Sequence, residues 1–129
     1  MRIIADTNFL IYLAKYKIFD EIEQFGKKIT LPLQVLDELK GFSLKKGKDK
    51  EAAALCLIVL KRWEKQKKVN FEKIEAESAD AAIVKMALAE KEKGKEFVVA
   101  THDRRIIKKL KKAKIRLIGV RQKRYLAEK

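Results

Sequence analysis

Short apolar segments alternate with longer segments of helical pattern along the whole chain, and this alternation constrains the fold more than any other feature. Apolar segments of this length predict strands, and apolar residues that recur every three or four positions predict helices. The predicted strands are 2–6, 28–32, 69–73, 96–101 and 115–120, and the predicted helices are 8–14, 18–25, 33–41, 49–67, 79–93 and 103–112. Such alternation favours right-handed crossovers. We therefore expect an α/β fold, a three-layer sandwich with a parallel sheet of five strands, in which residues 1–129 form a single domain.

Local signals support several boundaries of these helices. The Ser78 hydroxyl is suited to cap the start of helix 79–93, and Gly94 is suited to end it. Pro32 ends the second strand before the next helix begins. Residues 52–60 are apolar on nearly every side of helix 49–67, so this helix is either deeply buried or covers a partner subunit.

The net charge of +14 is concentrated near the carboxyl terminus. Residues 104–129 contain twelve Lys or Arg residues and one acid, Glu128, which together give +11. Such a block favours a polyanionic partner, most often nucleic acid, although a solvated surface is the alternative. The residues expected to contact nucleic acid are Lys45, Lys46 and Lys48 in the predicted loop 41–49, and Arg104, Arg105, Arg121, Lys123 and Arg124. The loop has an equally simple interpretation as a solvated connection between two helices.

The remaining composition indicates a protein of the cytoplasm without membrane contacts. No apolar run approaches the roughly 20 residues that span a bilayer, and Met1 leads directly into a predicted strand rather than a signal peptide. The single cysteine, Cys56, excludes an internal disulfide and fits a reducing compartment, where we expect it to pack in the core.

Four acidic residues occupy matching positions after the first four predicted strands. Asp6 ends the first predicted strand, Asp103 follows the fourth, Glu38 lies on the helix after the second, and Asp80 opens the helix after the third. Ligands of such sheets bind beyond the carboxyl ends of the strands, so we expect these side chains to lie near one another. Carboxylates are the oxygen ligands that Mg²⁺ or Mn²⁺ prefers. The sequence therefore predicts a divalent-metal site formed by Asp6, Glu38, Asp80 and Asp103.

Each acid also has a simpler interpretation. Asp103 is suited to cap the helix that follows it, and Asp80 is a first-turn acid that the helix dipole favours. Glu38 has an acidic neighbour, Asp37, which shows that surface acids are common on that helix. Asp6 is the hardest to explain in this way, because an acid between a buried strand and a helix needs a reason.

These segments resemble the PIN domain, a metal-dependent nuclease fold. The resemblance rests on IIADTNFL at 3–10, VLDELKG at 35–41, SADAAI at 78–83 and VVATHDRRI at 98–106, which span nearly the whole chain. It implies the sheet order 3-2-1-4-5, with Asp6, Glu38, Asp80 and Asp103 as the catalytic, metal-binding acids. It further implies that the Asn8 amide orients Asp6 and that the Thr101 hydroxyl hydrogen-bonds within the site.

Two more segments, GKDKEAAAL at 47–55 and RQKRYL at 121–126, are similar to an archaeal branch related to the eukaryotic small-subunit processing nuclease. The resemblance therefore implies ribosomal-RNA processing or a toxin-type ribonuclease, with a ribosome precursor or an antitoxin as partner. It also implies a homodimer. His102 departs from the small polar residue of many members, and either contacts a ligand or is a neutral neighbour of the site.

The leading hypothesis is a Mg²⁺- or Mn²⁺-dependent endoribonuclease. The phosphate chemistry alone does not separate RNA from DNA, and only the resemblance indicates RNA. A non-catalytic RNA-binding or assembly module on the same fold is the alternative. A phosphoacceptor domain would need an acid pair after the first strand and a lysine after the fifth, but these strands end in Asp6-Thr7-Asn8 and Gly119-Val120.

Overall fold

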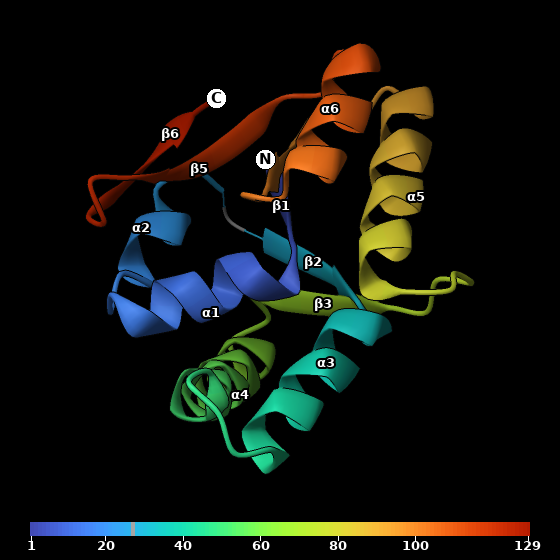
Figure 1. The fold of residues 1–129 in the computed structure, drawn as a ribbon. Helices are drawn as coiled ribbons and strands as arrows, with labels where there is room; N and C mark the ends of the chain where they lie inside the picture. Colours follow the sequence, from blue (N-terminus) through green and yellow to red (C-terminus); the bar gives the residue numbers. More distant parts are fainter. Residues whose placement is uncertain (27) are drawn as a thin grey trace.

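The computed structural model describes residues 1–26 and 28–129, and its helices and strands alternate as the sequence predicts (Figure 1). The strands are β1 (Arg2–Ala5), β2 (Lys28–Pro32), β3 (Val69–Glu72), β4 (Phe97–Ala100), β5 (Leu117–Arg121) and β6 (Tyr125–Glu128). The helices are α1 (Thr7–Lys15), α2 (Asp20–Glu23), α3 (Leu33–Leu44), α4 (Lys50–Lys65), α5 (Ala79–Glu92) and α6 (Arg104–Lys112).

The sheet has the order β3-β2-β1-β4-β5-β6, which confirms the predicted order of the first five strands. These five strands are parallel, and β1 is central because it pairs with both β2 and β4. Ile3, Ile4 and Ala5 of β1 are fully buried, as expected for a strand that helices cover on both faces. The carboxyl ends of β1 and β4 therefore lie side by side.

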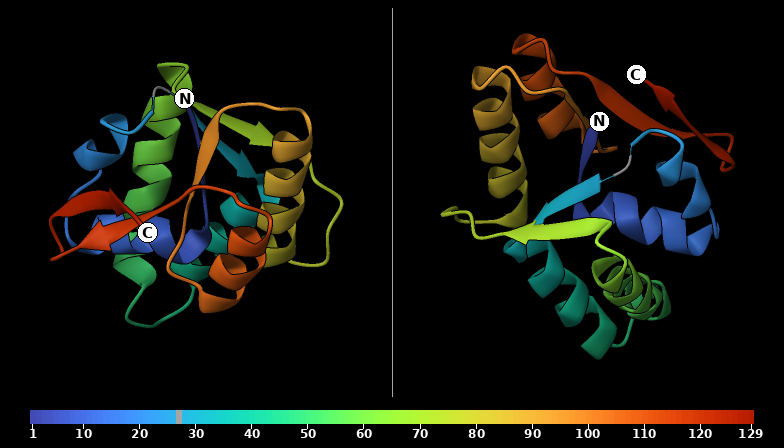
Figure 2. Two further views of the ribbon diagram at one scale, coloured as in Figure 1. Left: turned by 90° about the horizontal axis from the view of Figure 1, so that it is seen from above. Right: turned by 180° about the vertical axis from the view of Figure 1, so that it is seen from behind.

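Helices cover both faces of the sheet, so the predicted three-layer arrangement is confirmed (Figure 2). Helices α1 and α4 pack together on one side, and α5 and α6 pack together on the other. Helix α3 follows β2 at the carboxyl end of the sheet and contacts both α4 and α5. No helix in the described part of the chain is long and apolar enough to cross a membrane.

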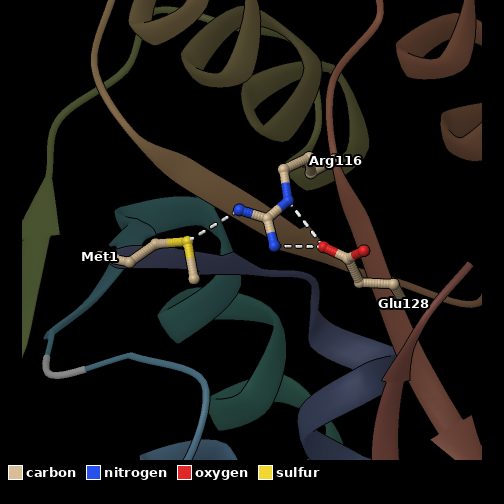
Figure 3. A network of polar contacts seen from close by, with 3 residues as sticks. All are labelled: Met1, Arg116 and Glu128. Carbon is tan, nitrogen blue, oxygen red and sulfur yellow. Dashed lines mark hydrogen bonds and ion pairs between the residues drawn. The ribbon is translucent and has the colours of Figure 1, made fainter.

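The sixth strand was not predicted. β6 runs antiparallel to β5, and Arg121 and Tyr125 are paired beside the connecting turn. The Arg116 guanidinium, just before β5, hydrogen-bonds Glu128 at the end of β6 and also approaches the Met1 sulfur at 3.5 Å (Figure 3). The strand was missed because its turn contains neither Gly nor Asn, the usual hairpin residues.

Two predicted segments differ from the structure. Helix α3 continues to Leu44, so the predicted loop 41–49 is reduced to the residues between Leu44 and Lys50. Helix α4 is not buried on every side, because Cys56 and Trp63 are buried whereas Ile58 is 59% exposed; the alternative, that the helix covers a partner subunit, stays a prediction. The predicted core position of Cys56 is thus confirmed.

Candidate active site

Asp6 lies between β1 and α1 and is held by bonds from two separate elements. Its Oδ1 accepts the Phe9 backbone N–H at 2.7 Å, so Asp6 caps α1, while its Oδ2 accepts the Thr101 hydroxyl. Only 3% of the residue is exposed. A nearly buried carboxylate with both oxygens bound has a fixed orientation.

Burial raises the pKa of Asp6 from 3.8 to about 6, because a charged carboxylate loses its hydration there. The hydrogen bonds from Thr101 and Phe9 act in the opposite direction, since they stabilise the ionised form. The negative charges of Asp80 and Asp103 raise the pKa further. Asp6 is therefore an acid whose ionisation the folded protein opposes.

Asp103 follows β4 and caps α6. Its Oδ1 accepts the N–H groups of Arg105 at 2.8 Å and Ile106 at 3.1 Å. Its own N–H donates to the Thr101 hydroxyl oxygen at 3.0 Å. The fully buried Thr101 thus connects Asp103 to Asp6, and the hydrogen bonding expected of Thr101 is present.

Asp80 lies in the first turn of α5, after the N-cap residue Ser78, whose hydroxyl accepts the Ala81 N–H at 3.1 Å. Partial burial raises the pKa of Asp80, the charge of Asp103 raises it further, and Arg105 lowers it. Asp6, Asp80 and Asp103 therefore act on one another electrostatically, although they come from three different strand–helix junctions.

Glu38 is an exposed residue of α3, and its Oε1 accepts the Thr7 hydroxyl at 2.5 Å. Thr7 is itself buried beside Asp6, so it joins Glu38 to the same corner of the sheet. The sequence analysis gave no role to Thr7, although a hydroxyl directly after Asp6 could have indicated one. Asn8 points to solvent, and among the described residues the bonds to Asp6 come from Phe9, Thr101 and the backbone rather than from Asn8.

The carboxylate oxygens of these four acids are the kind of ligand that a hard divalent cation prefers. Mutual repulsion between carboxylates and the opposed ionisation of Asp6 are both relieved by a bound cation. In residues 1–26 and 28–129, however, no group of three or more acidic, histidine or cysteine side chains is already placed to hold an ion. A cation here would have to retain waters between itself and some of these acids, as Mg²⁺ usually does.

His102 connects this corner to β5. Its Nε2 accepts the Val120 N–H at 3.1 Å, and its ring stacks on Phe9 with centroids 5.5 Å apart. Partial burial lowers the pKa of His102, and the nearby charge of Lys129 lowers it further. Its hydrogen bond and its lowered pKa favour the neutral form.

The basic residues expected to bind nucleic acid lie in three separate places. Arg104 and Arg105 begin α6 beside the acids, and Arg105 lines a cavity of about 230 Å³ with Ser78, Asp80 and Lys109. The others are exposed in two connections, with Lys45, Lys46 and Lys48 between α3 and α4, and Arg121, Lys123 and Arg124 around the β5–β6 turn.

The sheet order and the acids at the strand ends define a doubly wound α/β domain with an acidic centre at its carboxyl edge. A family model described as "PIN like domain" matches residues 3–123, and the chain belongs to this family. It is 37% identical over 132 positions to Ribonuclease VapC4 of Methanocaldococcus jannaschii, covering 96% of this chain and 93% of that protein.

Solved structures share the fold as well. The structure of the PIN domain endonuclease Utp24 superposes with a TM-score of 0.74 at 20% identity, covering 99% of this chain and 90% of the other. A domain of a functionally unknown protein from Methanocaldococcus jannaschii superposes with a TM-score of 0.62 at 18% identity, covering 93% of this chain and 91% of that domain.

Proposed function

We propose that this chain is a Mg²⁺- or Mn²⁺-dependent endoribonuclease that hydrolyses phosphodiester bonds at its acidic centre. The observation that carries the proposal is Asp6, an almost fully buried acid whose pKa is raised to about 6 beside Asp80 and Asp103. Groups whose ionisation the fold opposes gather at functional sites. Membership of the PIN-like family and the likeness to a protein named as a ribonuclease support the same reading.

Asp6, Asp80, Asp103 and Glu38 would hold the cation, directly or through water. The bound ion would supply an activated water and neutralise charge on the phosphodiester. Thr101 keeps the Asp6 carboxylate in one orientation and connects it to the Asp103 backbone. Thr7 acts similarly on Glu38. Arg104 and Arg105 begin α6 next to these acids and would contact phosphates near the reacting one.

The test compares Asp6→Asn with wild-type protein, using Asp37→Asn as a control. Asp37 is an exposed acid next to Glu38, so its removal changes the net charge equally. Mn²⁺ is titrated calorimetrically into each protein, and cleavage of labelled single-stranded RNA is followed in parallel. We expect Asp6→Asn to lose Mn²⁺ binding and cleavage while Asp37→Asn keeps both. Cleavage at the wild-type rate by a folded Asp6→Asn protein would refute the proposal.

A non-catalytic RNA-binding module is the second candidate. It is favoured by the finding that no three acidic, histidine or cysteine side chains among the described residues lie together as metal ligands would. In that case RNA binds equally with and without Mn²⁺, and no cleavage product appears at any metal concentration. The cellular role, as a toxin-type ribonuclease with an antitoxin or as a ribosomal-RNA processing nuclease, is tested by identifying the RNA cleaved in total cellular RNA.

We further propose a homodimer formed through α4. Ile58 is exposed at the centre of this helix, and Glu51 and Lys65 lie seven residues to either side of it, on the same face. A two-fold axis at Ile58 places Glu51 of one copy against Lys65 of the other, twice. A neighbouring groove of about 500 Å³ extends the surface available for contact. Its lining is mostly apolar and also includes three charged residues: Leu33, Leu36, Leu57, Leu60 and Phe71, with Lys40, Lys61 and Glu64.

Sedimentation of Ile58→Lys tests this interface. We expect this variant to be a monomer at concentrations where wild-type protein is a dimer. Leu88→Lys is the control, because Leu88 is also an exposed apolar helix residue, 45% exposed, but lies on α5. A monomeric wild-type protein, or an Ile58→Lys variant that still dimerises, would contradict the proposed contact.

A further inference from the structure

A row of aromatic rings leads away from the acidic centre along α1. It starts at Phe9, whose backbone N–H holds Asp6 and whose ring stacks on His102. The His102 ring lies 5.3 Å from the Tyr12 ring, and Tyr12 lies 4.5 Å from Tyr16 at the end of the helix. The row thus runs the length of α1, about 13 Å, from the first acid outward.

The outer part of this row is accessible. Phe9 is fully buried, but Tyr12 is only half-buried, and His102 and Tyr16 are each partly exposed to solvent. Tyr16 is 38% exposed, and Tyr125 on β6 is 40% exposed. The outer residues of the row are therefore within reach of a ligand in solvent.

Positive charge accompanies the rings at the outer end. The Lys123 ammonium lies 5.4 Å from the centroid of the Tyr16 ring, so the β5–β6 turn reaches the end of α1 (Figure 1). Exposed Arg121 and Arg124 flank Lys123 in the same turn. Aromatic rings beside cations are the usual means of binding single strands, since bases stack on the rings and phosphates contact the cations.

The turn that presents Lys123 is strained. Arg124 N–H donates to the Arg121 carbonyl at 3.1 Å, and Gln122 and Lys123 between them have φ values of 54° and 58°. Turns of this kind favour Asn-Gly, because side chains with a Cβ disfavour the left-handed conformation. Lys17, Lys67 and Lys114 also have positive φ, but each follows a helix end, where this conformation is common. The hairpin retains a lysine where glycine would be easier.

We propose that the solvent-exposed parts of Tyr12, Tyr16 and His102, together with the turn Arg121–Arg124, form a stacking site for a single-stranded segment of the RNA. The inference rests on the proposed function, because the row begins at the acidic centre. It specifies that function further: bases adjacent to the cleaved bond are unpaired and lie along α1, and duplex RNA does not use this site.

Binding of a labelled single-stranded RNA, followed by fluorescence anisotropy in EDTA so that no cleavage occurs, tests the site. Tyr16→Leu removes the ring, and Tyr16→Phe keeps it. We expect Tyr16→Leu to bind roughly tenfold more weakly and Tyr16→Phe to bind within about twofold of wild type, as the usual contribution of one stacked base implies. Duplex RNA should bind both variants equally.

An abasic RNA of the same length tests stacking without any variant. It keeps every phosphate, so wild-type protein should bind it more weakly than intact RNA only if bases contribute. Equal affinity of wild-type protein for the two RNAs overturns the inference. So does a Tyr16→Leu protein that loses the same affinity for both, because that loss would come from altered packing.

Lys123→Gly and Lys67→Gly form a matched pair for the charge. Both remove one lysine at a position of positive φ, but Lys67 lies before β3, at the amino edge of the sheet, away from the acids. We expect only Lys123→Gly to reduce the slope of log K against log salt, by about 0.7. Equal slopes for the two variants would contradict the site.

The two proposals fail in different ways. If ring-dependent binding persists in EDTA but Mn²⁺ never induces cleavage, the chain is a single-strand-binding module and the nuclease proposal fails. If wild-type protein cleaves RNA in Mn²⁺ but does not distinguish intact from abasic RNA in EDTA, only the stacking site fails.

Discussion

Asp6→Asn should make the metal-free protein more stable at neutral pH. In the unfolded chain Asp6 ionises with its ordinary pKa of 3.8, whereas burial raises the pKa to about 6 in the folded protein. Between these values the folded state binds more protons than the unfolded state. The free energy of unfolding therefore falls as pH rises from about 4 to about 6, and stays lower above it.

The size of this effect follows from the two pKa values. A difference between 3.8 and about 6, at 1.36 kcal/mol for each pH unit, corresponds to about 3 kcal/mol at pH 7. Asparagine keeps the bond from the Phe9 N–H but no longer accepts the Thr101 hydroxyl as a carboxylate does. That loss costs about 1 kcal/mol, so a net gain of about 2 kcal/mol remains.

Urea unfolding between pH 4 and 8 in EDTA measures the effect, with Asp37→Asn as the control for an exposed acid. Wild-type and Asp37→Asn proteins should lose stability between pH 4 and 6 relative to Asp6→Asn. Saturating Mn²⁺ should reverse the order by stabilising only proteins that retain Asp6, by about 2.7 kcal/mol at a hundredfold excess over Kd. Parallel pH profiles for wild-type and Asp6→Asn proteins would refute the reasoning.

Three further predictions concern Thr101 and Asp103 at the acidic centre and Lys123 in the β5–β6 turn. Thr101→Val should lower the free energy of unfolding by about 2 kcal/mol, because two buried hydrogen bonds are lost. It should also raise the pKa of Asp6 above 6, because the Thr101 hydroxyl lowers that pKa. Urea unfolding as a function of pH measures both effects, and Thr30→Val, at another buried threonine, is the control. Asp103→Ala should lose cleavage and about 1 kcal/mol of stability, because α6 loses its cap. Asp103→Asn should lose cleavage alone, because asparagine also caps helices. Equal stabilities of the Asp103→Ala and Asp103→Asn proteins would refute the capping role. Lys123→Gly should stabilise the protein by about 1 kcal/mol, because glycine adopts positive φ without strain. The thermal midpoint should therefore rise even though RNA binding becomes weaker. A lower midpoint would show that the turn is not strained.

The parallel part of the fold could be predicted from the sequence because β1, β2 and β4 are short, largely buried runs that are each followed by a helix. Ser78 does cap α5, and Gly94, with φ of 71°, does follow its end. β6 escaped prediction because its turn has none of the residues that normally mark a hairpin. The ion pair between Arg116 and Glu128 stabilises this hairpin, but no local turn signal indicates it.

The candidate site was predictable in its residues but less so in its bonds. Acids at matching strand ends indicated Asp6, Asp80 and Asp103, which do influence one another. The partner of Glu38 was not predictable, because Thr7 reaches it across 31 residues of sequence. The aromatic row was also missed, although Phe9, Tyr12 and Tyr16 recur at helical spacing. His102 and Lys123 join this row from segments distant in sequence.

The two capping acids affect how sequences related to this one should be compared. Asp6 and Asp103 start α1 and α6 as well as carrying the charge of the site. A descendant that abandoned cleavage would still need a capping side chain at both positions, so it should drift to Asn, Ser or Thr there. Asp80 and Glu38 carry no such duty, because Ser78 caps α5 and no side chain caps α3. In a lineage that loses activity, substitutions should therefore appear first at Asp80 and Glu38.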